Sequence, residues 1–361
     1  MYEIDNNTSW AAGAYPGWRK DKEFQYTLVV KQTFIFDAEG KLEPAVSSTP
    51  IQVVDEYHGD PQTTGIKIVN DIAPFKKGGE VLLLGTVYPH KIGASVTEAK
   101  ITINGENINW SKSITVFGKR KWTKVRGKYK PSKPEVLGTL ELDYQNSFGG
   151  WDEEIDDDQE SLNPIGTGFI PKVQKGGLFS TNAVVAGNPE GIELPQIELT
   201  KELIREPEDN PSPAGFGPIP PFWMPRAELS KDIDEEAAIA GCCHYKDNVA
   251  EEIYNCAPID QQFDSSFKGN LIISLQNMTK GKSNNYSLNL KVFLQAPELW
   301  SKEKDIETEL NPVCDTMLID MDKSELSLVW RAGVEKQMED DVPGWLYVID
   351  SKNSEDEALA S

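Results

Sequence analysis

Histidine is scarce in this chain, and this limits the acid–base machinery that the chain could carry. The three histidines are His58, His90 and His244. His58 lies in the phrase Tyr57-His-Gly-Asp60, where an imidazole and a carboxylate could act as an acid–base pair. A turn rich in Gly and Asp explains the same letters. We therefore expect a turn here and predict no catalytic residue.

The four cysteines are Cys242, Cys243, Cys256 and Cys314. His244 follows the first two directly, so soft metal ligands gather in this segment. Adjacent cysteines rarely both reach one tetrahedral ion, and the chain has no Cys-x-x-Cys spacing. The pattern favours small thiols over a zinc site, and we predict no metal and no cofactor. The cysteines are also too sparse for a secreted disulfide scaffold, which favours a reducing, cytoplasmic location.

Several common catalytic signatures are missing from the sequence. The chain has no Gly-x-Ser-x-Gly, no Gly-x-x-x-x-Gly-Lys-Ser/Thr and no His-Glu-x-x-His. Gly215-Phe-Gly217 is followed by prolines, which cannot open a phosphate-binding helix. A glycosidase-like pair of carboxylates stays open, because a folded chain with 58 acidic residues brings some of them together.

Two segments concentrate charge of opposite sign. Residues 151–160 hold seven carboxylates, which could bind Ca²⁺, but the spacing does not match an EF-hand and favours an exposed loop. Residues 119–133 hold eight basic side chains with Trp122 and Tyr129 between them, a composition found in nucleic-acid patches.

The chain as a whole is acidic. Its 361 residues include 36 Lys and Arg against 58 Asp and Glu, a formal charge of −22. Such a chain repels polyphosphates and anionic lipids, so we expect no nucleic-acid partner. The basic segment is more simply paired with the acidic loop of the same chain or with an acidic protein. No apolar run approaches the length of a membrane span, and no signal peptide is visible at the N-terminus.

Most elements are predicted to be strands. Residues 26–36 are rich in β-branched and aromatic side chains, and the turn after them predicts a return strand from Leu42. Asn104-Gly105 predicts a hairpin, in which alternation directs Ile101, Ile103 and Trp110 toward the core. Further strands are expected at residues 65–69, 81–88, 138–144, 269–275, 286–294, 316–320 and 326–330.

We divide the chain into three regions. Residues 1–145 form an N-terminal antiparallel β region, residues 146–262 a Gly/Pro-rich loop region, and residues 263–361 a C-terminal β-hairpin region with an acidic tail. Large aromatic side chains favour ordered loops, packed on the β core, over a disordered linker in the middle region. Short helices are expected at residues 232–240 and 250–254. The predicted fold class is mainly β, with antiparallel, sandwich-like sheets, long ordered loops and few short helices.

A series of phrases, taken together, resembles the domain of unknown function 2169 family. In chain order they are Leu28-Val-Val-Lys-Gln-Thr-Phe34, Gly59-Asp60, Val81-Leu-Leu-Leu-Gly-Thr-Val-Tyr-Pro89, Val116-Phe-Gly-Lys-Arg-Lys-Trp122, Tyr144-Gln-Asn-Ser-Phe-Gly-Gly150, Asn163-Pro-Ile-Gly-Thr-Gly-Phe169, Pro213-Ala-Gly-Phe-Gly-Pro218 and Asn255-Cys-Ala-Pro-Ile-Asp-Gln261. The resemblance runs from about residue 20 to about residue 335. The sequence departs from the family pattern at residues 226–255, and its preference for a partner could differ there from that of other family members.

The resemblance implies a binding role. Members of the family are encoded beside type VI secretion effectors and act as adaptors or chaperones. It therefore implies a non-enzymatic, cytoplasmic bacterial protein that binds an effector, such as one with a spike-tip repeat or transmembrane toxin domain, and helps to load it on the spike protein. The alternative is a carbohydrate-active or other hydrolytic β protein with paired carboxylates.

Residues of the family phrases, with two aromatic neighbours, are the expected partner contacts. They are Phe148, Gly149, Gly150, Trp151, Asn163, Pro164, Gly166, Gly168, Phe169, Gly215, Phe216, Gly217 and Trp223.

Overall fold

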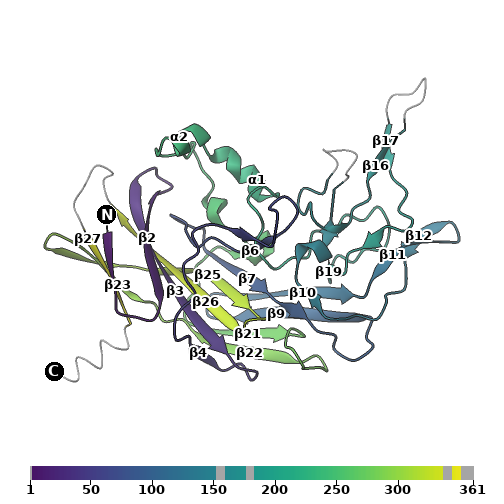
Figure 1. The fold of residues 1–361 in the computed structure, drawn as a ribbon, viewed down its shortest axis with the longest axis horizontal. Coiled ribbons are helices and arrows are strands. Elements are labelled where there is room, and N and C mark those ends of the chain that lie inside the picture. The colour runs from purple at the N-terminus through teal and green to yellow at the C-terminus, as the bar shows by residue number, and fades with distance from the viewer. Residues whose placement is uncertain (1, 152–158, 176–182, 336–343, 351–361) are drawn as a thin grey trace.

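The computed structural model describes residues 2–151, 159–175, 183–335 and 344–350. Within these residues the chain is mainly β, with several mostly antiparallel sheets and few short helices, as the sequence predicts (Figure 1). The helices are α1 (Arg226–Leu229) and α2 (Glu235–Ile239), with 3₁₀ turns η1 (Tyr144–Asn146), η2 (Ser230–Asp232), η3 (Glu251–Tyr254) and η4 (Ile259–Gln261). None of the described helices is long and apolar enough to cross a membrane.

A seven-stranded sheet is the largest element of the fold. Its order is β2 (Ala11–Trp18), β3 (Phe24–Phe36), β26 (Glu325–Glu335), β25 (Val313–Asp320), β7 (Gly79–Leu84) and β20 (Gln262–Phe263), with β4 (Leu42–Pro44) beside β3. The predicted return from β3 to β4 is confirmed, and the predicted strands at residues 316–320 and 326–330 pair with each other as β25 and β26. β26 also pairs with β3, and β25 pairs in parallel with β7. Strands from both ends of the chain therefore share one sheet.

A five-stranded sheet lies against it. The order is β19 (Ile197–Leu199), β10 (Asn109–Phe117), β9 (Val96–Asn104), β21 (Asn270–Gln276) and β22 (Ser287–Phe293). The predicted hairpin is confirmed, because Asn104 pairs with Asn109 across the turn. The predicted alternation is confirmed for Ile101 and Ile103, which are fully buried, while Trp110 is half-buried.

One apolar core joins the two large sheets. Val81 and Leu83 of β7 pack there with side chains of β9 and β21. Leu82, between them, points to the opposite face of the sheet and packs in a second cluster with Cys256. Both faces of β7 are therefore covered, which explains why its sequence is an unbroken apolar run rather than an alternating one.

Smaller sheets surround this core. A four-stranded sheet has the order β1 (Tyr2–Asn6), β27 (Gly344–Ile349), β23 (Glu298–Glu303) and β24 (Ile306–Leu310). A three-stranded sheet of β12 (Lys128–Pro131), β11 (Arg120–Val125) and β18 (Glu193–Leu194) lies toward the other end of the molecule (Figure 1). The two-stranded pairs are β13 (Leu140–Glu141) with β8 (Thr86–Val87), β14 (Phe148–Gly149) with β15 (Thr167–Gly168), β16 (Lys172–Lys175) with β17 (Ala183–Ala186), and β5 (Glu56–Tyr57) with β6 (Ile66–Ile68).

The middle region holds the helices and most of the irregular structure. The helix expected at residues 232–240 is α2, which is shorter, and the one expected at residues 250–254 is the 3₁₀ turn η3. Both elements are only about one turn long. Phe216 and Trp223 are buried, so these described loops pack against the rest of the protein.

Candidate partner-binding site

Three glycine-rich segments of the middle region meet at one place, which we call the glycine-rich junction (residues 144–150, 163–169 and 213–218). β14 and β15 pair there in parallel, with Phe148 opposite Thr167. The third segment is attached by the Ala214 N–H, which donates to Ser147 Oγ at 2.5 Å. The junction therefore brings together segments that are far apart in the sequence.

Asn163 holds the junction together. Its side chain is fully buried, and Nδ2 donates to the backbone oxygens of Tyr144 at 2.8 Å and Phe148 at 2.9 Å. Its backbone oxygen accepts the N–H groups of Gly150 and Gly166. Gly149 has a φ of +152°, and a Cβ there would overlap the Asn163 carbonyl oxygen. This position therefore requires glycine.

Tyr144 connects the junction to the third segment. Its hydroxyl donates to the Gly217 oxygen at 3.2 Å, and its ring lies edge-on to Trp223 at 5.6 Å between centroids. Burial raises the pKa of the Tyr144 phenol above its ordinary value. A Cβ on Gly215 would overlap the Tyr144 ring. Position 215 therefore requires glycine because the backbone packs closely against the Tyr144 ring, and not because of turn geometry.

Lys112 supports the junction from β10. Its Nζ is buried and donates to the Gly215 oxygen at 2.6 Å, to Gln261 Oε1 at 2.8 Å and to Asp260 Oδ1 at 2.9 Å. Burial lowers the pKa of Lys112, and Asp260 opposes that effect. The ammonium also lies 4.9 Å from the Phe216 ring centroid. Three polar acceptors and an aromatic face thus compensate the desolvated charge.

Sequence reasoning did not single out Lys112. The available signal was its position on β10, where residues 110, 112, 114 and 116 point to one face. Ile114 and Val116 are buried there. A lysine in register with buried apolar residues indicates a buried, partnered charge.

A cavity of about 530 Å³ opens beside the junction, and we call it the glycine-rich cavity. It is lined by Gln62, Thr63, Gln145, Asn146, Gly149, Gly150, Trp151, Pro164, Ile165, Gly166, Thr167, Gly168 and Phe169. Trp151 is 51% exposed, which is unusual for so large an apolar side chain. Four of these lining residues are glycines, and Trp151 adds one exposed indole that an occupant could contact.

Residues 21–331 match the family described as "uncharacterized protein conserved in bacteria (DUF2169)". The chain belongs to this family. The predicted resemblance is confirmed in its extent. Searches of curated proteins and of solved structures found no match.

The expected contact residues of this DUF2169 protein divide into two groups. Those that are buried are Phe148, Gly149, Gly150, Asn163, Gly215, Phe216, Gly217 and Trp223. Those with accessible surface are Trp151, Pro164, Gly166, Gly168 and Phe169. The first group shapes the junction from inside, and its Gly149 and Gly150 also line the glycine-rich cavity, as does the whole second group.

A second cavity, of about 230 Å³, gathers carboxylates of this DUF2169 protein. Asp143, Asp320 and Asp322 line it, together with His58. Asp143 Oδ1 accepts the Gln145 N–H at 2.9 Å and so caps η1. Asp320 pairs with Lys323 Nζ at 2.9 Å. These bonds give the two carboxylates structural partners, and His58 is exposed in the bend after β5.

One described carboxyl group has a raised pKa. Burial raises the pKa of Glu198, although Arg120 and the Ile204 N–H stabilise its charged form. The Arg120 guanidinium donates to Glu198, and Ile204 N donates to it at 2.8 Å. Glu198 lines neither cavity and links β19 to Arg120, the first residue of β11, and to the loop after β19.

The cysteine segment offers no assembled metal site within the part of the chain that the structure describes, where no group of three or more His, Cys, Asp or Glu converges. Cys242 is exposed and Cys256 is buried. Burial raises the pKa of the Cys256 thiol to about 12. Six of the seven carboxylates of residues 151–160, the segment that could bind Ca²⁺ or form an exposed loop, lie outside the described residues.

Proposed function

We propose that this protein is a non-enzymatic adaptor or chaperone that binds a type VI secretion effector and helps to load it on the secretion spike. Family membership supports the proposal through the role that the resemblance implies. The observation that carries it is the glycine-rich cavity, whose rim bears the half-exposed Trp151. The cytoplasm is the compartment in which such loading takes place.

The physical argument rests on a rigid scaffold beneath an accessible surface. Asn163 and Tyr144 fix the backbone of the junction by hydrogen bonds, so little ordering entropy is lost when a partner binds. Trp151 and Phe169 offer aromatic surface, and aromatic side chains commonly supply most of the binding free energy of an interface. Gly166 and Gly168 keep accessible surface and line the same cavity.

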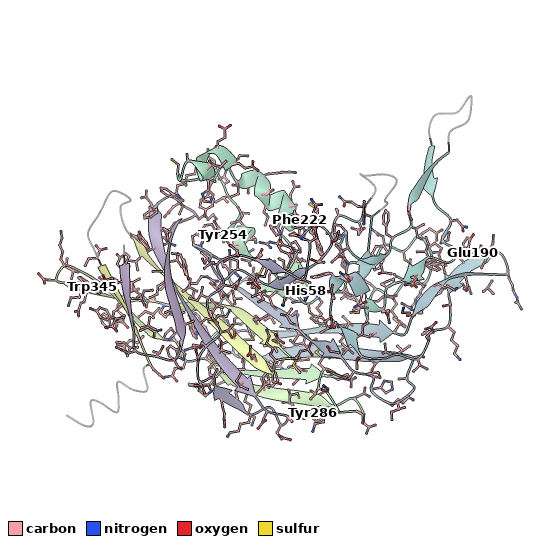
Figure 2. All side chains as sticks on the ribbon, viewed as in Figure 1. His58, Glu190, Phe222, Tyr254, Tyr286 and Trp345 are labelled. Carbon is pink, nitrogen blue, oxygen red and sulfur yellow. The ribbon has the colours of Figure 1, made fainter. Side chains whose placement is uncertain are left out.

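The test is co-expression with candidate effectors, followed by pull-down and by measurement of effector solubility. We expect one effector to be retained in a complex and to be lost from the soluble fraction without this protein. Trp151→Ala should weaken retention by about tenfold or more. Trp345→Ala is the matched control, since Trp345 is also exposed but does not line the glycine-rich cavity. Figure 2 shows it at the opposite end of the molecule from Glu190. Equal loss in both variants, or retention of no effector by the folded protein, would contradict the proposal.

The second candidate is a hydrolase that uses paired carboxylates. The second cavity described above favours this candidate, because Asp143 and Asp320 both line it. In that case a screen of glycosides and esters should give turnover that Asp143→Asn abolishes without a change in thermal stability. Turnover that survives both Asp143→Asn and Asp320→Asn would exclude this cavity as its source.

A further inference from the structure

The hairpin of β11 and β12 has a charge opposite to that of the rest of the protein. Residues 119–133 contain eight basic side chains and no acidic one. The formal charge of −22 therefore divides into +8 on this segment and −30 on all other residues. Because the charge is distributed so unevenly, this segment is a local basic region that attracts an acidic surface.

The hairpin is a defined element rather than a loose loop. β11 and β12 pair in register from Trp122 opposite Pro131 to Val125 opposite Lys128. Arg126 and Gly127 form the connecting turn with φ values of +51° and +82°, the backbone of a type I′ hairpin turn. The hairpin extends outward at the end of the molecule away from β27, on the right in Figure 1.

The two faces of the hairpin differ. On the inner face Trp122 is buried and Tyr129 packs with it against Leu194 and other apolar side chains. This contact anchors the hairpin to the body of the protein. Tyr129 is also fixed by its hydroxyl, which donates to Asn188 Oδ1 at 2.9 Å.

The outer face is basic and exposed. Because side chains alternate along a strand, Lys121, Thr123 and Val125 of β11 share this face with Lys128 and Lys130 of β12. The three lysines are exposed, and Val125 is 50% exposed between them. Lys121 and Lys130 are diagonal neighbours on adjacent strands, a spacing of about 7–8 Å at which like charges repel one another.

One basic residue of the segment is already neutralised. Arg120 is buried, pairs with Glu198 and stacks over the Phe117 ring. The other seven are exposed, and none of them makes an ion pair with any residue that the structure describes. Lys124 instead lies over the Tyr129 ring, 5.3 Å from its centroid. The charges on the hairpin are thus accessible to a partner.

We propose that the outer face of the β11–β12 hairpin binds an acidic segment of a separate protein, whose carboxylates pair with the lysines and whose apolar side chain contacts Val125. Charge complementarity identifies this occupant. A nucleic acid fits less well, because a long polyanion that leaves the hairpin meets a body of charge −30. The surface is separate from the glycine-rich cavity, so the inference does not depend on the proposed function.

The test measures binding of a labelled 20-residue polyglutamate peptide to the full-length protein by fluorescence anisotropy at low and high salt. We expect saturable binding that weakens as salt screens the charges. The variant K121E/K128E/K130E, which changes the three lysines of the outer face, should weaken binding by about tenfold or more. The matched control is K268E/K280E/K291E, which makes the same charge change at three exposed lysines elsewhere and should bind like the parent protein. Near- and far-ultraviolet circular dichroism confirms that both variants are folded.

Four outcomes would overturn the proposal. Equal weakening in both variants would show that net charge alone attracts the peptide. Tighter binding of a 20-nucleotide oligothymidylate than of polyglutamate would assign the hairpin to nucleic acid. Self-association at low salt that K121E/K128E/K130E removes would assign it to a second copy of the chain. Peptide binding that appears only after the six carboxylates of residues 152–158 are changed to amides would assign it to the acidic segment of the same chain.

Discussion

At the scale of single residues, Gly215 tests whether the junction is as closely packed as its contacts indicate. A Cβ at this position would overlap the Tyr144 ring, whereas nothing lies within 4 Å of a Cβ on Gly138. Gly215→Ala should therefore lower the free energy of unfolding by about 1–3 kcal/mol, because the ring or the backbone has to move. Gly138→Ala should leave it unchanged or raise it by about 0.4–1 kcal/mol, through a less flexible unfolded chain. Urea unfolding of both variants measures the difference, and equal stability would refute close packing.

Asn163 tests the polar half of the same junction. Its Nδ2 donates to two backbone oxygens, so Asn163→Asp places a carboxylate against two acceptors in a buried position. We expect a loss of about 3 kcal/mol or more, since neither acceptor keeps its donor and a charge is buried. Asn311→Asp, at an exposed position, is the control and should unfold like the parent protein. Thermal and urea unfolding at neutral pH give both values, and a stable Asn163→Asp protein would rule out the central role of Asn163.

At the scale of elements, the sequence predicts what is local and misses what is not. The hairpin at Asn104-Gly105 and the return strand at Leu42 follow from turn residues next to alternating strands. The parallel pairing of β7 with β25 joins residues 80–84 to residues 316–320, and no periodicity encodes such a contact. β14 and β15 have two residues each, and the Asn163 side chain fixes them rather than any pattern.

The contacts that build the candidate site are also long-range, so the sequence shows only part of them. Its phrases were recognised, but the sequence did not show which of their side chains face inward. Phe216 and Trp223 are as aromatic as Trp151, yet the first two are buried and the third is exposed. That distinction depends on Lys112, which reaches Phe216 from β10, and on Tyr144, whose ring packs against Trp223.

β7 is also linked to the middle region by a buried charge. Glu80 pairs with Lys76, and its Oε2 accepts the N–H groups of Cys256 at 2.8 Å and Ala257 at 2.9 Å. Burial alone would raise the pKa of Glu80, but Lys76 and the two N–H groups lower it below the ordinary value of 4.5. Because the folded-state pKa is the lower one, this carboxylate stabilises the fold above pH 4.5. The contribution is lost as pH falls through the folded-state pKa.

Glu80→Gln should therefore lower the free energy of unfolding by about 3 kcal/mol at pH 7, because Lys76 stays buried without its partner. The gap between this variant and the parent protein should narrow as pH falls below 4.5. Urea titrations at neutral and acidic pH measure it. Glu43→Gln, which removes an exposed pair with Lys41, is the control and should have no measurable effect. A gap that is constant with pH would show that Glu80 is not charged in the fold.

At the scale of the whole molecule, the sheets combine strands from both ends of the chain. β26 and β25 lie between β3 and β7 in the seven-stranded sheet, and β1 pairs with β27. A fragment of residues 1–145 would leave β3 and β7 without the strands that separate them and would expose apolar strand edges. We expect this fragment to be insoluble or unfolded alone, and co-expression with residues 146–361 to restore a soluble complex. Circular dichroism and thermal unfolding check this. A soluble 1–145 fragment with its own cooperative transition would instead establish the N-terminal region as an independent folding unit.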